Sequence, residues 1–418
     1  MLARYFSRSR TLILIALPII VMLIIGLVRV TAPHPSTLLF LDSTLQTQQS
    51  QQDSSDTRLL HGPLASLGWI VGYDCQRGLQ AYLKTAATNP DAALVGTGWV
   101  DPTNGHLING QRNNCTPGSL SMDNVVPLIH SKGGMAYLTI TMDTGGSPES
   151  WTSQQQSDYI ARAANNNSLI EPIIHETQRL HYDGVIMDLE AGYHAYPNIQ
   201  HLFATYNQHV WAALKPLHKL YGIALLHKLS DHDEYYNLNA FENWSLLGHT
   251  ADFMVIMAVD QSYFTPGPTV SVPWLRQLLA YELKTMPQML PRTIWELPLY
   301  GAWWHLAGGQ WKFDGGANYS DAQAFVSHLN PSEIDVAATN LNDPTSAHVV
   351  YTDSSRVEHA LWYHTAKNLY YVITNFQQVL KKVPQFKNSY LQIAVWYRAT
   401  WEPGDVWSML NKVLPNAS

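Results

Sequence analysis

The chain has 418 residues, 46% of them hydrophobic and 14% charged, so it is long and apolar enough to bury one large domain core or two ordinary ones. Its formal net charge of −7 leaves no basic excess of the kind that binds nucleic acid, and we expect no nucleic-acid partner. The 14 Trp and 22 Tyr are typical of sugar-binding surfaces and also of large cores, and composition alone does not separate the two.

The N-terminal segment has the pattern of a membrane anchor. Residues 1–10 are basic, and Leu12–Val28 then runs without a charged residue. As a helix this run spans roughly 26 Å, which is enough to cross a bilayer core. The basic flank predicts a cytoplasmic N-terminus with the rest of the chain outside. We expect residues 11–31 to be a single-pass signal-anchor in the cell membrane; cleavage near Ala32, which would make the chain secreted, is the alternative.

A polar linker, rich in Gln and Ser, is expected over residues 32–58. The only cysteines are Cys75 and Cys115, which either form one disulfide or remain two buried thiols. Neither their spacing nor that of the 18 histidines matches a metal-binding motif, and we expect no metal and no cofactor.

Residues 59–418 alternate short apolar runs with helical segments. Eight runs are predicted strands: Leu67–Tyr73, Ala92–Val100, Met135–Thr141, Val185–Glu190, Gly222–Leu226, Phe253–Val259, Thr293–Leu299 and Ile393–Tyr397. Helical stretches lie between most of them, among them Ser153–Ala164, Ile199–Leu220, Trp274–Thr285 and Lys367–Lys382.

This alternation predicts an α/β protein built as a (β/α)8 TIM barrel. A doubly wound sheet also fits the alternation, but no Gly-rich phosphate loop follows the first strand. The long gap between the seventh and eighth strands holds two strand-like runs, Ala347–Thr352 and Ala360–Trp362. We therefore expect a small inserted α+β lobe at about residues 305–365, and the N-terminal transmembrane helix before the barrel.

The fourth predicted strand ends in two acids, Asp188 and Glu190. Because side chains alternate along a strand, both acids share one face with Ile186, while Val185 and Met187 point the other way. Two carboxylates side by side at the carboxyl end of a barrel strand are costly to bury, since each disfavours ionisation of the other. The carboxyl ends of barrel strands carry the catalytic groups of such folds, so the pattern predicts an active site there.

Four segments, in order, resemble glycoside hydrolase family 18, the chitinase-like family. Residues 183–190 (DGVIMDLE) resemble its D-G-x-x-x-D-x-E signature, and residues 251–260 (ADFMVIMAVD) resemble its D-x-x-x-x-M-x-Y-D block. Residues 294–301 (IWELPLYG) resemble its G-x-P-x-Y-G strand, and residues 393–396 (IAVW) its eighth strand. The likeness spans about residues 64–410 and is greatest to the bacterial branch of spore-germination and cell-wall glycosidases.

The resemblance implies a substrate-assisted mechanism, in which the N-acetyl oxygen of the sugar attacks the anomeric carbon. Glu190 is then the general acid and later the base for water, and Asp188 holds the acetamido N–H. Trp396 is expected to form the floor of the sugar site. The other expected substrate-binding residues are Asp260, Met257, Tyr300, Tyr193, Tyr263 and Trp303. Tyr300 could instead pack at the rim of the barrel. Trp303 could instead pack under the inserted lobe.

Two positions depart from the family. Ile186 stands where chitinases usually have another Asp, which couples to the position of Asp188, and Val259 stands where the family has a Tyr that bonds the acetamido oxygen. Loss of that hydroxyl costs about 2–4 kcal/mol of transition-state stabilisation if nothing replaces it.

The sequence thus predicts a membrane-anchored extracytoplasmic glycosidase. Its expected partner is a polysaccharide with β-linked N-acetylglucosamine, of chitin or peptidoglycan type, and its second partner is the membrane, through the N-terminal helix. A catalytically silent carbohydrate-binding protein on the same barrel is the alternative, which Val259 favours and Glu190 disfavours. A third interpretation has the acid pair acting on a glycoside without an acetamido group.

Overall fold

A computed structural model of the chain describes a part of its residues in detail. It divides into two compact units, residues 1–57 and 58–418. All described residues belong to the second unit: 66–72, 75–108, 124–142, 151–190, 196–232, 241–329, 335–387, 389, 391–396, 402 and 404–413.

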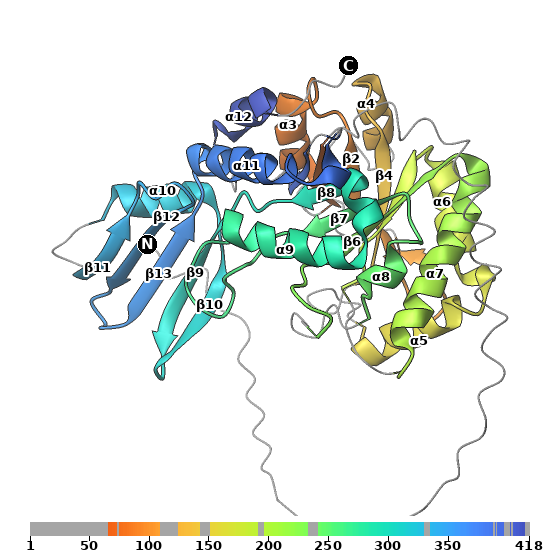
Figure 1. The fold of residues 1–418 in the computed structure, drawn as a ribbon, viewed down its shortest axis with the longest axis horizontal. Helices are drawn as coiled ribbons and strands as arrows, with labels where there is room; N and C mark the ends of the chain where they lie inside the picture. The colour runs from red at the N-terminus through yellow and green to blue at the C-terminus, as the bar shows by residue number, and fades with distance from the viewer. Residues whose placement is uncertain are drawn as a thin grey trace, which may run out of the picture. The chain divides into compact units, whose positions relative to one another are not determined.

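Eight parallel strands form a closed barrel (Figure 1). Each strand pairs with its two neighbours in the order β1-β2-β4-β5-β6-β7-β8-β14, and β14 pairs with β1 to close the ring. The predicted TIM barrel is confirmed. The strands are β1 (Leu67–Val71), β2 (Ala92–Val100), β4 (Ala136–Thr141), β5 (Gly184–Met187), β6 (Leu220–Leu226), β7 (Phe253–Met257), β8 (Thr293–Glu296) and β14 (Gln392–Trp396). A short strand, β3 (Leu107–Ile108), adds to β2 in antiparallel orientation.

Helices cover the outside of the barrel (Figure 1). The α-helices are α3 (Cys75–Thr85), α4 (Val125–Ser131), α5 (Ser153–Ala163), α6 (Glu171–Arg179), α7 (Ile199–Leu214), α8 (Trp244–Leu247), α9 (Val272–Thr285), α11 (Ala366–Leu380) and α12 (Val406–Val413). Short 3-10 helices are η3 (Asn167–Leu169), η4 (Lys215–Leu217), η6 (Pro287–Arg292) and η7 (Pro384–Phe386). Side-chain caps start several of the α-helices; Thr152 and Thr365, for example, each form a capping box.

The helix predicted over Ile199–Leu220 is too long. The α-helix ends at Leu214, and η4 follows it with Pro216 in its first turn. Proline has no backbone N–H to continue the helical bonds, and His218 then takes a left-handed conformation (φ 54°). Strand β6 begins two residues later, at Leu220.

The two faces of β5 pack as the alternation predicts. Ile186 belongs to the hydrophobic cluster inside the barrel. Val185, Met187 and Leu189 belong to the larger cluster that the strands share with the surrounding helices. A strand buried on both faces reads as a continuous apolar run, which is why the sequence shows it clearly.

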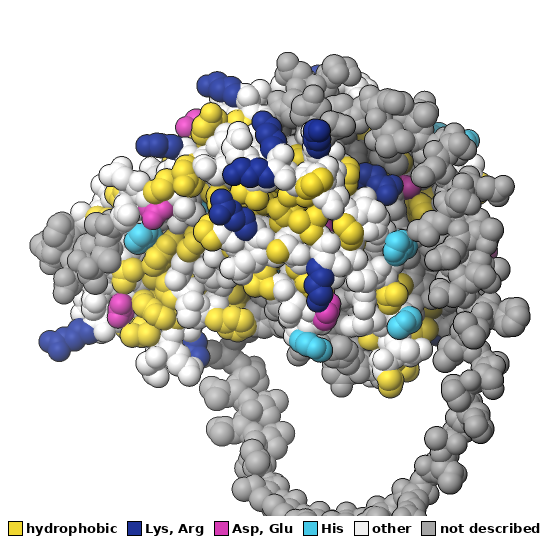
Figure 2. All heavy atoms as spheres, viewed as in Figure 1, with side chains coloured by type: hydrophobic (Ala, Val, Ile, Leu, Met, Phe, Trp, Pro, Cys, Tyr) yellow, Lys and Arg dark blue, Asp and Glu magenta, His cyan; other side chains and the backbone are white. Residues whose placement is uncertain are grey.

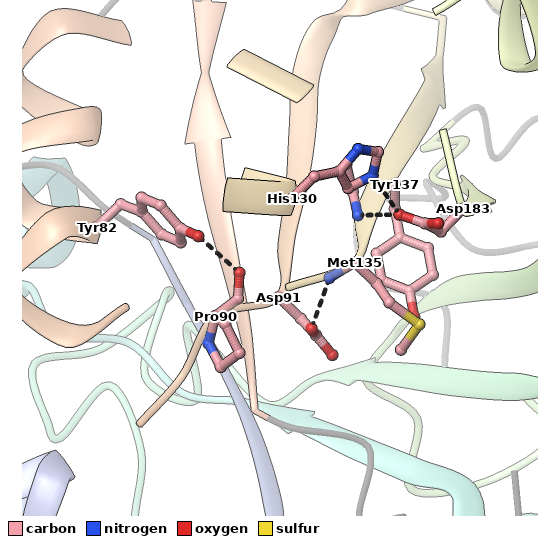
Figure 3. Close-up of polar contacts among 8 residues, drawn as sticks. Tyr82, Pro90, Asp91, His130, Met135, Tyr137 and Asp183 are labelled. Atoms are coloured by element: carbon pink, nitrogen blue, oxygen red, sulfur yellow. Dashed lines mark hydrogen bonds and ion pairs between the residues drawn. The ribbon is translucent and has the colours of Figure 1, made fainter. Parts of the chain in front are cut away.

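Two aspartates tie neighbouring strands together at the amino-terminal end of the barrel (Figure 3). Asp91, before β2, accepts a hydrogen bond from the backbone N–H of Met135 at 2.8 Å, and burial raises its pKa to about 7. Asp183, before β5, accepts from the backbone N–H of Ala136 at 2.8 Å and lies 2.8 Å from His130 Nε2. These contacts hold the amino-terminal ends of β2, β4 and β5 in place, far from the carboxyl ends that carry Asp188 and Glu190.

The segment between β8 and β14 forms an inserted antiparallel sheet with one helix. Its strand order is β10-β9-β13-β12-β11. The elements are β9 (Gly301–Ala307), β10 (Gln310–Ala317), α10 (Tyr319–Ser327), β11 (Asp335–Asn340), β12 (Ala347–Thr352) and β13 (Glu358–Tyr363). We call this segment the inserted lobe.

Each face of the inserted lobe has its own hydrophobic core. On the α10 side, Leu361 and Tyr363 pack with Trp303 and Phe325. On the other side, Trp304 packs with its neighbours, and its indole N–H donates to the carbonyl of Tyr263 at 3.0 Å. Because Tyr263 lies in the loop after β7, this bond fixes the lobe against the carboxyl-terminal face of the barrel.

Several sequence predictions concern residues outside the described part of the chain. The predicted membrane span (residues 11–31) and linker (residues 32–58) are among them. Within the described part, no helix has both the length and the apolar character that a bilayer crossing needs. Cys75, buried at the start of α3, is disulfide-bonded; the other cysteine of the chain, Cys115, lies outside the described residues.

Candidate active site

Asp188 lies directly past the carboxyl end of β5. Its backbone N–H continues the strand ladder by donating to the carbonyl of Ile140 at 2.9 Å, which fixes the residue at the mouth of the barrel. The side chain is buried, and Oδ1 has no hydrogen-bond partner among the described residues. Burial raises the pKa of Asp188, and the nearby carboxylate of Glu296 raises it further.

Glu190 follows two residues later and is half-buried. Its negative charge raises the pKa of two buried acids, Glu296 and Glu242, so it lies close to both. The acid pair after the fourth barrel strand therefore lies near one acid at the end of β8 and one in the segment between β6 and α8.

Glu296, the last residue of β8, is a site residue that the sequence analysis did not single out. It is 2% exposed, and its Oε1 accepts a hydrogen bond from the indole N–H of Trp396. Oε2 forms no hydrogen bond of ordinary geometry in the described part of the chain, but the indole N–H of Trp69 lies near enough to lower the pKa of Glu296 in part. Burial, opposed by the bond from Trp396, raises the pKa of Glu296 to about 8, and the charges of Glu190 and Asp260 act in the same direction as burial.

Two indoles lie under this acid. Trp396 ends β14 and is half-buried, and Trp69 on the neighbouring strand β1 is its partner in register. The two rings stack with centroids 6.0 Å apart and an interplanar angle of 27°. Both rings belong to the hydrophobic cluster inside the barrel, so Trp396 presents a flat apolar surface beside the carboxyl of Glu296.

Asp260 and Tyr300 come together from the ends of β7 and β8. The hydroxyl of Tyr300 donates to Asp260 Oδ1 at 2.9 Å. Burial raises the pKa of Asp260, and the bond from Tyr300 lowers it in part. Met257, the last residue of β7, is opposite Glu296 in the strand register. Asp260, Met257 and Tyr300 thus join Asp188 and Glu190 at one end of the barrel.

A buried lysine and a buried glutamate border Glu190 on the side of β6. The ammonium of Lys228 donates to the backbone carbonyl of Glu242 at 2.8 Å, and the Glu242 carboxylate accepts from the backbone N–H of Leu226 at 3.3 Å. Burial raises the pKa of Glu242 well above its usual range, and the charge of Lys228 opposes this rise. The pair places one positive charge within a strongly acidic region.

Two of the remaining expected substrate-binding residues, Trp303 and Tyr263, pack against the inserted lobe. Trp303 packs edge-on against Phe325 in the core of the inserted lobe, with ring centroids 5.2 Å apart, which is the packing alternative of the sequence analysis. Tyr263 stacks on Phe313 of the lobe at 4.3 Å. Tyr193 lies outside the described residues.

The two departures from the family are both apolar side chains inside the barrel. Ile186 is fully buried and Val259 is 9% exposed, and both belong to the interior cluster that contains Trp69 and Trp396. Neither brings a polar atom to the site.

The sequence did carry a signal for Glu296. In the segment 296–301 (ELPLYG), Glu296 stands at the first glycine of the G-x-P-x-Y-G pattern. An acid in place of a glycine, at the carboxyl end of a barrel strand, marks the position as unusual. Only the structure shows that its side chain points inward, toward Trp396 and away from the helices.

This arrangement suits acid–base chemistry on a flat apolar ligand. One half-buried acid, Glu190, is available to give and take a proton, and buried carboxyls of raised pKa surround it. Within the described residues, no group of three or more His, Cys, Asp and Glu side chains is placed to hold a metal ion.

No family model matches the chain, and no curated protein matches it by sequence. Solved structures do. A chitinase from Chromobacterium violaceum matches with a TM-score of 0.63 at 17% identity, over 84% of this chain and 100% of that chain. The spore cortex-lytic enzyme SleL from Bacillus cereus matches with a TM-score of 0.64 at 16% identity, over 84% of this chain and 75% of that chain.

A chitinase-like agglutinin from Robinia pseudoacacia is also similar, with a TM-score of 0.57 at 11% identity, over 84% of this chain and 99% of that chain. At these identities the likeness concerns the fold. The chain has the barrel fold of chitinase-type proteins, a fold found in enzymes and in a chitinase-like agglutinin.

Proposed function

We propose that this protein is a glycosidase that cleaves a polysaccharide containing β-linked N-acetylglucosamine, of chitin or peptidoglycan type, by substrate-assisted retaining catalysis. The observation that carries the proposal is the group of acids at the carboxyl end of the barrel. Asp188, Glu190, Asp260 and Glu296 meet there beside the indole of Trp396. A chitinase-type barrel supplies the frame for this group.

In the proposed reaction Glu190 protonates the glycosidic oxygen as its bond to the anomeric carbon breaks. The acetamido oxygen of the same sugar forms the new bond to that carbon, and Asp188 accepts the hydrogen bond of the acetamido N–H. Water then attacks the anomeric carbon, the ring formed with the acetamido oxygen opens, and the proton of the water returns to Glu190. Two displacements at one carbon retain its configuration.

Burial explains why these groups can serve such a reaction. Carboxyls shielded from water keep their protons to higher pH, and electrostatic effects at a dry site are larger than in bulk solvent. The apolar face of Trp396 matches the flat apolar face of a pyranose, so the sugar is expected to rest on it.

A catalytically silent carbohydrate-binding protein is the second candidate. Val259 favours it, because a buried valine provides no hydroxyl for the acetamido oxygen. The same fold occurs in a protein named as a chitinase-like agglutinin rather than as an enzyme. The half-buried acid Glu190 favours the enzyme, because a sugar-binding site needs no proton donor at that position.

The deciding experiment measures the release of reducing ends from chitin oligomers and from peptidoglycan, with wild-type protein and with Glu190→Gln. We expect wild-type cleavage of at least one polymer and a loss of about 100-fold or more in kcat for the variant. Glu171→Gln, a change at an exposed acid on α6, is the matched control and keeps full activity. Binding without cleavage by both wild type and Glu190→Gln establishes the silent alternative instead.

A polymer of β-linked glucose without acetamido groups tests the mechanism separately. Substrate assistance requires the acetamido oxygen, so this polymer is expected to remain intact. Its cleavage would favour the third interpretation, a glycosidase acting on other sugars.

The anchored, extracytoplasmic location also belongs to this proposal. The disulfide at Cys75 agrees with an oxidising compartment. If residues 11–31 anchor the chain, full-length protein sediments with membranes and external protease degrades residues 59–418 in intact cells. Recovery in the soluble cytoplasmic fraction contradicts the anchor.

A further inference from the structure

Three neighbouring barrel strands bring one acid and two tryptophans together on the inward face. Glu296 ends β8, Trp396 ends β14 and Trp69 lies in β1. Ala394 is opposite Glu296 in the strand register and lies two residues before Trp396. Trp69 is the register partner of Trp396 on the next strand. Because side chains two residues apart share a strand face, the acid and both rings point into the barrel.

The indole of Trp396 is held on two sides. Its N–H donates to Oε1 of Glu296. Trp69 stacks on it, with ring centroids 6.0 Å apart and an interplanar angle of 27°, and covers part of one face. Trp69 is 1% exposed, whereas Trp396 is half-buried. The ring of Trp396 therefore keeps an open part of its surface at the carboxyl end of the barrel.

A carboxyl group is unusual at position 296. The side chain of Glu296 is 2% exposed, and the family pattern that residues 296–301 resemble has a glycine there. Removal of a carboxyl group from water costs free energy, which hydrogen bonds from indole donors offset only in part. Neither a glycine nor an apolar side chain, however, offers an acceptor to the indole N–H of Trp396.

We propose that Glu296 is a positioning residue that holds the indole of Trp396 in the plane on which the sugar rests. With one edge bonded to Glu296 and part of one face against Trp69, the ring is ordered before a ligand binds. A ligand then loses no free energy in ordering it. The identity of the ligand, a pyranose of the cleaved polymer, rests on the proposed function; the contact between the two side chains does not.

The contact is tested without ligand or reaction, by NMR of the full-length protein with isotope-labelled tryptophan. The indole N–H resonance of Trp396 is the one that Trp396→Phe lacks. In wild type this N–H is expected to exchange slowly with water, although the side chain is half-buried. Glu296→Leu removes the acceptor, so the exchange is expected to become about 10-fold faster or more. Glu296→Gln keeps an acceptor oxygen and is expected to give an intermediate rate.

Glu282→Gln is the matched control, since Glu282 is another fully buried acid, on α9. It leaves the exchange of the Trp396 N–H at the wild-type rate. Melting curves establish that each variant is folded, and if Glu296→Leu does not fold, Glu296→Gln decides. An exchange rate that is the same in wild type and in every folded variant at position 296 would show that Glu296 does not hold the ring, and the proposal would be wrong.

Steady-state kinetics with the cleaved oligomer tests the effect on the ligand. The measurement is made at pH 6, where burial keeps Glu296 protonated because its pKa is about 8, so that a neutral substitute leaves the charge of the site unchanged. Glu296→Leu is expected to raise KM by about 3- to 10-fold and to leave kcat within about 3-fold, since a mobile ring weakens the binding of substrate and transition state alike. Glu296→Gln is expected to keep KM within about 2-fold of wild type.

Two results would overturn the positioning role. One is a fall in kcat at unchanged KM, which would assign Glu296 to the chemistry at Asp188. The other is a folded Glu296→Leu protein with wild-type values of both constants, as expected of a residue that serves the fold alone. A wild type that binds the chitin oligomer and cleaves nothing refutes the proposed glycosidase. The dissociation constant of the oligomer then takes the place of KM, and the same rise in Glu296→Leu tests the positioning role.

Discussion

Asp260 adopts a left-handed backbone conformation, with φ at 57°, three residues past the end of β7. Among residues other than glycine, Asp and Asn tolerate this conformation best, because their short polar side chains bond locally. The turn directs the carboxyl of Asp260 to the hydroxyl of Tyr300 and close enough to Glu296 to raise its pKa. A strained backbone position here serves the geometry of the site.

Replacing Tyr300 with Phe removes the hydroxyl and keeps the ring. The pKa of Asp260 is then expected to rise, because the bond from Tyr300 lowers it. If the reaction needs the ionised carboxylate, the acid limb of the kcat/KM profile moves to higher pH, and kcat/KM falls roughly 10-fold near pH 5. The unfolding free energy falls by about 1–2 kcal/mol.

Tyr370→Phe, at a 49% exposed position on α11, is the control for this change and leaves both quantities unaltered. A pH profile of Tyr300→Phe that superimposes on that of wild type would show that Asp260 does not titrate in the reaction.

At the residue scale, the sequence predicted the acids Asp188 and Glu190 of the candidate site but not Glu296. Asp188 and Glu190 are visible because strand alternation places them on one inward face. Glu296 is hidden in a run of apolar residues, and no alternation shows that its side chain lies against Trp396 from a strand about 100 residues away. The aromatic residues Tyr263 and Trp303 were predicted at the site by position, but their rings pack on the lobe, a contact that depends on tertiary structure.

At the level of elements, all eight barrel strands were predictable. A parallel strand covered on both sides is a short apolar run bounded by turns, and such runs stand out in a sequence. The strands β2, β4 and β6 end where predicted, whereas β1, β5, β7 and β8 were predicted too long at their carboxyl ends; the fourth strand ends at Met187 and not at Glu190. Side-chain alternation continues past Met187, and the backbone N–H of Asp188 still bonds to Ile140, so the sequence pattern does not mark where the strand ends.

The inserted lobe was harder to predict from the sequence. Two of its strand segments, Ala347–Thr352 and Ala360–Trp362, gave a signal, and the structure has strands over both. Strand β10 (Gln310–Ala317) has every second side chain exposed, and a bulge between Phe313 and Gly315 shifts its pairing with β9. The lobe also begins earlier than about residue 305, with β9 at Gly301.

Gly301 is the residue at which the chain enters the inserted lobe, and it has no room for a side chain. A Cβ at this position would lie 2.1 Å from the carbonyl oxygen of Trp362 on β13. Because that atom belongs to the backbone, the β9–β13 pairing must move apart to relieve the contact. We expect Gly301→Ala to lower the unfolding free energy by about 2–3 kcal/mol, measured by urea denaturation.

Gly404→Ala is the matched control, because an added Cβ there meets no atom within 4 Å. Its stability should stay within about 0.5 kcal/mol of wild type. If both variants had the same urea midpoint, β9 could move away from β13 without loss of stability.

At the scale of the whole molecule, acids outnumber bases among the buried ionisable residues that the structure describes. Asp91 and Glu282 are buried outside the candidate site, and Glu242, Asp188 and Glu296 are buried within it. On the face shown in Figure 2, Lys and Arg side chains are scattered among hydrophobic ones and form no continuous patch. Burial raises the pKa of each of these five acids, so together they make the stability of the fold depend on pH.

The sign of this dependence follows from Glu282, which accepts a hydrogen bond from Thr293 in the core between α9 and β8. Its pKa rises from 4.5 to about 8 through burial. Between these two values the folded chain holds a proton that the unfolded chain has lost. The stability that this proton contributes is therefore complete below about pH 4.5 and disappears as the pH rises to about 8.

We therefore expect the melting temperature to be higher at pH 5 than at pH 8. Glu282→Gln removes one of the titrating groups, so the difference between the two temperatures becomes smaller, by at most the equivalent of about 4 kcal/mol. The exposed Glu171→Gln leaves the difference unchanged. A melting temperature that rises from pH 5 to pH 8 would mean that the buried acids are ionised in the folded protein.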